Sequence, residues 1–227
     1  MERIGTDYGG WYIHTNSNLN SDSIIYSVGV GEDISFDLLM SEKYKSNIYL
    51  IDPTIRAIKH VDVMRSFYKD NSELPENISN EYKSIIVNAK PDIEKMFYVP
   101  YGLWDSTTKL PFFEPVNKKY VSCTVIPKMY SEDFYLVDVT SVKELMKMYN
   151  HTKIDMIKLD IEGAEIEVVN KMLDDQIYPT YLLIEFDLFL KHKDPQNRTK
   201  TLINRILECG YSVLKNDNMN ITFYQYL

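Results

Sequence analysis

Short apolar segments alternate with helical segments along most of this chain, and that alternation restricts the fold more than any other feature. The expected strands lie near residues 24–29, 47–51, 96–100, 135–139, 154–159, 181–186, 211–215 and 220–226, and the expected helices near residues 34–45, 55–69, 81–95, 141–149, 163–174 and 197–208. Strands interleaved with helices predict an α/β fold with an open, mainly parallel sheet and helices on both of its faces. The last two strands, joined by "NDNMN", predict an antiparallel hairpin at the edge.

Two segments interrupt the alternation. Residues 70–80, "DNSELPENISN", form a polar stretch that predicts a loop. Residues 106–133 read as an insertion between elements, with a small β excursion at "KYVSCTVI".

Length and charge limit the classes of protein to which the chain can belong. Its 227 residues suffice for one core, so we expect a single domain over 1–227. The formal net charge of −8, without a block of basic residues, argues against binding nucleic acid. No apolar stretch approaches the roughly 18 residues of a membrane span, and the first residues lack a signal-peptide core. Two cysteines without a disulfide framework favour a reducing compartment, so we expect a cytoplasmic protein.

The strand near 24–29 runs directly into a glycine turn that carries two acids. Gly29 and Gly31 close the strand, and Glu32 and Asp33 follow at once. The chain has only 8 glycines, where average usage of about 7% gives roughly 16. Several of the few glycines follow strands, as Gly102 does, and the carboxyl ends of such strands form the crevice where ligands bind. The turn therefore predicts a ligand site.

The next strand, "NIYLID", ends in Asp52, a residue placed to accept the hydroxyls of an adenosine ribose. Such a carboxylate serves NAD and S-adenosylmethionine (SAM) alike. NAD would bring a pyrophosphate close to Glu32 and Asp33, which would repel it. The turn also lacks the third glycine of the G-x-G-x-x-G pattern. SAM, which presents an ammonium and a sulfonium, is the favoured ligand.

Three motifs carry a resemblance to a known family. The run "IKLDIEGAE" (157–165) resembles the fourth-strand motif of FkbM-like SAM-dependent methyltransferases. The run "YSVGVGEDISFD" (26–37) is similar to the first motif of a related methyltransferase-like group, and "ERIGTDYGGWYI" (2–13) is similar to the segment with which that group begins. The common family form has an aspartate where this chain has Ser27. Ser27 is still expected at the cofactor, with Glu32 or Asp33 supplying some of the hydrogen bonding to its methionine end.

The resemblance implies a fold and a chemistry. It implies a Rossmann-like class I methyltransferase with a mainly parallel seven-stranded sheet and an antiparallel C-terminal hairpin. Its usual reaction is O-methylation, often of sugars or polyketide-type hydroxyls. In this fold the adenine commonly lies on the residues after the third strand, here "YGLWD". Gly102, with Leu103 or Trp104 over the ring, is therefore expected at the adenine, although Trp104 equally fits a core position.

Acidic residues at two strand ends are the candidates for catalysis. Lys158 and Asp160 share one strand face, and "LLIEFD" places Glu185 and Asp187 on the neighbouring strand. Asp160 is expected to act as the base that removes the proton from the attacking hydroxyl. Alternatively, Asp160, Glu185 and Asp187 hold one Mg or Mn ion that lowers the pKa of that hydroxyl, or Lys158 and Glu185 form only an ion pair.

One histidine is a further candidate. His14 follows the N-terminal Gly-Gly segment, and we weigh it as an alternative base.

The sequence leaves three functions to compare. The favoured one is a SAM-dependent O-methyltransferase acting on a small molecule or glycan. The second is a SAM-binding scaffold without catalysis, which would keep Asp52 and the glycines but lack a working base. The third, an NAD-dependent oxidoreductase, is disfavoured by Glu32 and Asp33.

Overall fold

The structure is a computed structural model that describes residues 1–117, 120–126, 132–186 and 197–226. Its centre is a seven-stranded sheet in the order β11-β12-β10-β9-β3-β4-β5. The strands are β3 (Ile24–Val28), β4 (Asn47–Ile51), β5 (Met96–Val99), β9 (Met156–Leu159), β10 (Tyr181–Glu185), β11 (Tyr211–Asp217) and β12 (Asn220–Gln225). The first five are parallel, and β12 pairs antiparallel with both β10 and β11. The predicted α/β class, the mainly parallel sheet and the C-terminal hairpin are confirmed.

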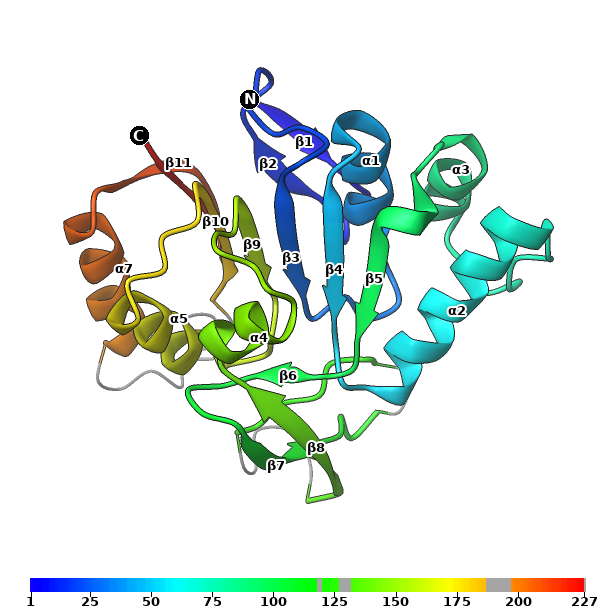
Figure 1. The fold of residues 1–227 in the computed structure, drawn as a ribbon. Helices are drawn as coiled ribbons and strands as arrows, with labels where there is room; N and C mark the ends of the chain where they lie inside the picture. The colour runs from blue at the N-terminus through cyan, green and yellow to red at the C-terminus, as the bar shows by residue number, and fades with distance from the viewer. Residues whose placement is uncertain (118–119, 127–131, 187–196, 227) are drawn as a thin grey trace.

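Helices cover both faces of this sheet (Figure 1). On one face lie α1 (Ser35–Tyr44), α2 (Ile55–Asp70) and α3 (Asn80–Asn88), and on the other lie α4 (Val142–Met148), α5 (Glu165–Asp174) and α7 (Arg198–Glu208). Two helices begin at residues that the sequence marks as caps. The side chains of Thr54 and Ser141 accept hydrogen bonds from the backbone amides of Ala57 and Glu144.

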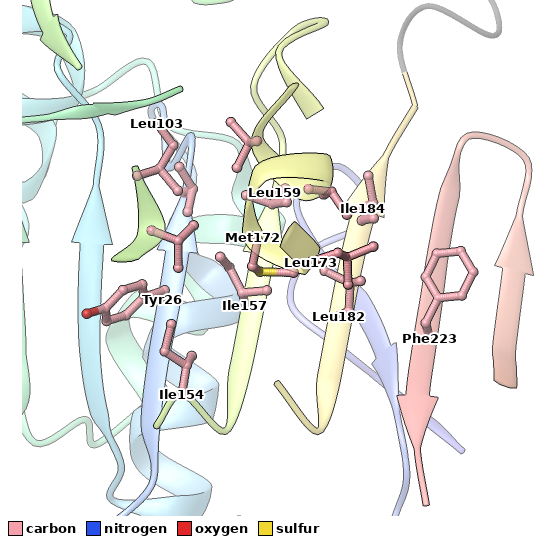
Figure 2. Close-up of a cluster of buried hydrophobic side chains, with 14 of the residues drawn as sticks. Tyr26, Leu103, Ile154, Ile157, Leu159, Met172, Leu173, Leu182, Ile184 and Phe223 are labelled. Carbon is pink, nitrogen blue, oxygen red and sulfur yellow. The ribbon is translucent and has the colours of Figure 1, made fainter. Parts of the chain in front are cut away.

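Each face has its own apolar core. Figure 2 shows the cluster beneath α5, in which Met172 and Leu173 pack against Leu159, Leu182 and Ile184 from the central strands. These side chains are almost entirely buried. Burying a side chain of this size stabilises the fold by roughly 1.5–3 kcal/mol. The two cores fix the central strands, and so fix the residues that follow them.

Two smaller sheets flank the central one. The N-terminal hairpin pairs β1 (Glu2–Ile4) with β2 (Trp11–Ile13), and a three-stranded sheet has the order β6-β8-β7. Its strands β6 (Gly102–Leu103), β7 (Thr108–Phe113) and β8 (Phe134–Thr140) lie below the ends of the central strands in Figure 1.

The structure corrects three expectations about these elements. The strand expected at 135–139 exists, but it lies in the small sheet and not in the central one. The β excursion expected at 119–126 is reduced to one antiparallel bridge, between Thr124 and Phe113, and the strand of this region lies earlier, at Thr108–Phe113. The helix expected over 81–95 ends at Asn88, and a separate 3-10 turn, η1, covers Ile93–Lys95. A proline at position 91 explains this end, because the residue before a proline is disfavoured in a helix.

Within the described part of the chain, none of the helices combines the length and the apolar character needed to cross a membrane.

Candidate active site

The register of the central sheet aligns five residues in one row at its carboxyl edge. Ile51 pairs with Val28, Val28 with Leu159, and Leu159 with Ile184. The residues that follow them therefore lie side by side, and the pairing of Glu185 with Asn220 extends the row to β12. The row runs Asp52, Gly29, Asp160, Glu185 and Asn220, with neighbouring strands about 4.8 Å apart. Three carboxyl groups thus converge on one edge.

The two glycines of the turn have different roles. Gly29 has φ +73°, and a Cβ atom there would lie 1.7 Å from the carbonyl oxygen of Asp160. Only glycine allows these two backbones to approach so closely. Gly31, with φ +54°, faces open space, because its Cβ would meet only a side-chain atom of Val121 at 3.7 Å. Gly29 is therefore needed for packing, and Gly31 leaves the wall of the pocket bare.

A pocket opens above this row of residues. It is lined by most of the residues expected to form the site: Gly29, Gly31, Glu32, Asp33, Asp52, Gly102, Leu103, Lys158, Asp160 and Glu185. The sequence-based expectation that separate strand ends meet at one site thus agrees with the geometry. Their roles toward a ligand remain predictions.

Asp52 is held rigidly in this pocket. Its carboxylate accepts hydrogen bonds from the backbone amides of Thr54, at 2.8 Å, and Gly31, at 3.1 Å, and the residue is 5% exposed. Burial raises the pKa of Asp52, and these hydrogen bonds oppose the rise. The Thr54 side chain also hydrogen-bonds with this carboxylate. Because a carboxylate has about four lone-pair positions, Asp52 keeps room to accept from a ligand without rearrangement.

The two acids behind the glycines are engaged with protein partners. Glu32 receives two hydrogen bonds from Arg56, at 2.9 Å and 2.6 Å. Asp33 accepts from the hydroxyl of Thr6 at 2.7 Å and from the amide of Ser35 at 2.8 Å. Both acids line the pocket, but their first role is to hold α2 and the N-terminal segment against the glycine turn.

Asp160 has a different environment. Its side chain is 33% exposed, and the Lys158 ammonium lies 3.8 Å from its carboxylate. Burial raises the pKa of Asp160; Lys158 opposes the rise, Glu162 adds to it, and a hydrogen bond with Glu185 opposes it. A carboxyl group whose pKa is raised toward neutrality, and which reaches the pocket, is suited to accept a proton.

No group of three or more His, Cys, Asp or Glu side chains within the described ranges is arranged to hold a metal ion. Of the three expected metal ligands, Asp160 and Glu185 line the pocket, and Asp187 lies outside the described residues.

The roof of the pocket is the part that sequence reasoning missed. Tyr8 and Gly9, between β1 and β2, line it from one side, and residues 121–123 line it from the other. The second segment is anchored by Thr124, whose buried hydroxyl donates to the carbonyl of Glu162 at 2.6 Å. The only sequence signal for this part of the lining is the "DYGG" run near the N-terminus, and no local pattern indicates which strand end it covers.

Three expected site residues lie elsewhere. Ser27 is fully buried beneath the turn, beside Asp37, and does not line the pocket. Trp104 also lies outside the lining, and its amide donates to the carbonyl of Thr140 at 2.9 Å. His14 hydrogen-bonds with the hydroxyl of Tyr181 at 3.1 Å, away from the pocket.

Comparison with known proteins gives one match. The family model described as "Methyltransferase FkbM domain" matches residues 6–213. Of the row at the strand ends, this range includes Gly29, Asp52, Asp160 and Glu185 but not Asn220. No curated protein and no solved structure matches the chain.

Proposed function

The chain belongs to the FkbM methyltransferase domain family, and from this premise we propose that it transfers a methyl group from SAM to a hydroxyl group of a small molecule or glycan. We take residues 1–227 as one Rossmann-like class I domain in this proposal. The observation that carries the proposal is the row of carboxyl groups from Asp52 through Asp160 to Glu185, which faces a pocket at the carboxyl ends of parallel strands.

The charge of the pocket favours SAM as the cofactor. Among the described residues the lining holds six acids, Glu32, Asp33, Asp52, Asp160, Glu162 and Glu185, and one cation, Lys158; Arg56, outside the lining, pairs with Glu32. A sulfonium and an ammonium are attracted to such a site, whereas the pyrophosphate of NAD is repelled. The same charge argues for a methyl donor and against a dinucleotide.

The residues present fit the parts of SAM. Asp52 would accept hydrogen bonds from the ribose hydroxyls, and the bare backbone at Gly31 would face the methionine end. Gly102 and Leu103, buried at the start of the small sheet, would form the adenine side. When bound, SAM supplies an electrophilic methyl group.

Asp160 is the proposed base. A hydroxyl has a pKa far above 7, and a base positioned within hydrogen-bond reach contributes about 10²–10⁴-fold to the rate. The raised pKa of Asp160 improves its match to that proton. Lys158, buried against the turn and 3.8 Å away, keeps enough of Asp160 ionised to act. Glu185, hydrogen-bonded to Asp160, orients the carboxyl group.

Calorimetric titration of the protein with SAM and with NAD, followed by transfer of a radiolabelled methyl group to a panel of hydroxylated acceptors, tests the proposal. We expect SAM to bind, NAD not to bind, and label to appear in an acceptor. Gly31→Val should abolish SAM binding by filling the bare wall. Gly210→Ala is a matched control outside the pocket: it also places a side chain at a positive φ, of +90° against +54° at Gly31, but its added atom meets only one side-chain atom, at 3.8 Å. SAM binding without transfer to any acceptor would instead support a non-catalytic scaffold, and NAD binding would support an oxidoreductase.

A further inference from the structure

A second groove begins where the cofactor pocket ends. It lies between the N-terminal hairpin and the turn that joins β11 to β12. Its lining comes from Arg3, Asp7, Tyr8, Gly10, Trp11, Tyr12, Glu185, Lys215, Asp217, Asn218, Met219, Asn220 and Thr222. The two sides are joined by a hydrogen bond from the Thr222 hydroxyl to the carbonyl of Tyr12, at 2.9 Å. The groove is therefore built from two hairpins that are fixed to each other.

Three residues line both the groove and the cofactor pocket: Tyr8, Glu185 and Asn220. Glu185 and Asn220 are direct partners in the β10–β12 pairing, at the end of the strand-end row. Among the residues that the structure describes, the buried side-chain oxygen Oδ1 of Asn220 has no hydrogen-bond partner. A buried acceptor of this kind costs about 1–3 kcal/mol unless it is satisfied. A hydroxyl group at this junction would satisfy it.

Tyr8 stands at the same junction and is 79% exposed, although it lines both cavities. Its pKa is raised, first by loss of solvation and then by the carboxylates of Asp160, Glu162 and Glu185. Most of its side chain is open to solvent. A ligand that extends from the groove to the pocket would cover the ring of Tyr8 and gain its contact area.

The chemistry of the groove selects against charge in its ligand. Arg3 is paired with Asp7 at 2.5 Å, and Lys215 lies over the ring of Tyr12, 4.8 Å from its centroid. Arg3 and Lys215 are the charged donors of the groove, and Asp7 and Asp217 are charged acceptors, so the two kinds are in near balance beside the aromatic rings. An anionic ligand would have to approach Glu185 at the junction, and a cationic ligand would have to approach Arg3 and Lys215 in the groove, and each approach costs free energy. Hydroxyl groups can use both donors and acceptors.

We propose that this groove is the binding site of the methyl acceptor, that the acceptor is an uncharged polyhydroxylated molecule, and that it reaches the methyl group through the opening between Tyr8, Glu185 and Asn220. This inference rests on the proposed function. It adds a location, a set of residues and a charge class for the acceptor, none of which the cofactor pocket provides. In the transfer, the acceptor oxygen forms a bond to the methyl carbon as the bond from carbon to sulfur breaks, and the hydroxyl proton passes to Asp160.

Two neighbouring residues offer a matched test. Asp217 and Asn216 are consecutive on β11 and both are exposed, but only Asp217 lines the groove. Asp217→Phe would obstruct the groove, and Asn216→Phe adds the same bulk outside its lining. Lys215→Ala removes a second groove donor without adding volume. The acceptor probes are neutral methyl pyranosides, D-glucosamine as a cation and D-glucuronate as an anion. Calorimetry gives the SAM affinity, labelled methyl transfer gives KM, and saturation-transfer NMR with S-adenosylhomocysteine present gives binding directly.

We expect a neutral pyranoside to be the best probe. Asp217→Phe should raise its KM at least about tenfold and remove its saturation-transfer signal, with SAM affinity within about twofold of the wild type. Lys215→Ala should raise KM about threefold, and Asn216→Phe should change neither value. If Asp217→Phe behaves as Asn216→Phe does, the groove is not the acceptor site. If glucuronate is preferred, or if no neutral probe binds, the charge class is wrong. If the wild type does not bind SAM at all, the proposed function fails before the groove is tested.

Discussion

Asp52 and Asp160 occupy the same place on two strands of one sheet, yet their surroundings differ. Each directly follows a buried parallel strand and each lines the pocket. Asp52 is 5% exposed and is held by two backbone amides. Asp160 has a 33% exposed side chain, with a lysine at 3.8 Å and other carboxyl groups around it.

The difference shows how environment assigns roles to identical side chains. Backbone donors hold the Asp52 carboxylate in one orientation, which suits recognition of fixed hydroxyl groups. Burial, with a smaller contribution from Glu162, makes ionisation of Asp160 costly, which suits an exchange of protons. If the two roles differ, changes at Asp52 should lower SAM affinity and changes at Asp160 should lower turnover.

Asp160→Asn should produce the largest effect. The amide preserves shape but cannot accept a proton, so turnover should fall at least about 100-fold. SAM affinity should remain within about twofold, because the change leaves the Asp52 side of the pocket intact. Initial rates on a confirmed acceptor and calorimetry with SAM measure the two values.

Asp138→Asn provides the control for that variant. Asp138 is an exposed acid on β8, 56% exposed and paired with Lys109. It should leave both measurements unchanged. Full turnover by Asp160→Asn would remove Asp160 from the mechanism and make Glu185 the next candidate.

Asp52→Ala should affect binding, where Asp160→Asn affects rate. Loss of a charged acceptor for the ribose should cost about 2–3 kcal/mol, or roughly 30- to 150-fold in SAM affinity. Calorimetry checks this, with Asp138→Ala, at the exposed acid on β8, as the control. Unchanged SAM affinity in Asp52→Ala would contradict the assignment of Asp52 to ribose recognition. Binding could then no longer be given as the role that distinguishes Asp52 from Asp160.

A third aspartate, Asp37 on α1, lies outside the pocket lining and can be compared with Asp52 and Asp160. It is 2% exposed, and burial raises its pKa from 3.8 to about 6, against the opposing influence of Lys158 and Ser27. Because the folded pKa is the higher one, protonation favours the folded state. The stability from this group is complete below about pH 4 and is lost as the pH rises through 6.

Asp37→Asn should therefore stabilise the protein at pH 7 by about 1–3 kcal/mol and leave its stability nearly unchanged at pH 4. Urea unfolding of both proteins at several pH values measures the difference. A constant difference across that range would mean that Asp37 is not buried in its charged form at pH 7.

Much of this arrangement could be predicted from local pattern. Apolar runs located the central strands, so Asp52 and Asp160 were found as the residues that follow them. Gly31 was found as bare backbone at the turn. These features depend on periodicity and on the rule that ligands bind at the carboxyl ends of parallel strands.

The remainder depends on partners that are distant in sequence. Whether a carboxylate is available to a ligand cannot be read from its neighbours in sequence: Glu32 is engaged by Arg56 on α2, which is 24 residues away. His14 was a reasonable candidate base, but Tyr181 holds it outside the pocket. Tyr8 reaches the pocket because Thr6 bonds to Asp33, which lies 27 residues away. Tertiary contacts of this kind have no local signature.

The smallest expected effect is that of a metal chelator, and it decides how Asp160 differs from Asp52. Lys158 offsets the cost of ionising the acids at the strand ends. Its ammonium lies 3.8 Å from the Asp160 carboxylate and 3.5 Å from the carbonyl of Gly29. A divalent ion bound to Asp160 and Glu185 would have to share this space with a buried ammonium, and two like charges that close repel strongly. We therefore expect turnover after treatment with EDTA to stay within about twofold of the untreated value, with Asp160 acting as a direct base.

Loss of activity with EDTA, restored by Mg²⁺ or Mn²⁺, would instead mean that Asp160 and Glu185 are metal ligands, with Asp187 as the third. In that case Lys158→Met should strengthen the metal dependence, because it removes the competing charge, whereas for a direct base it should move the acidic limb of the pH–rate profile to higher pH.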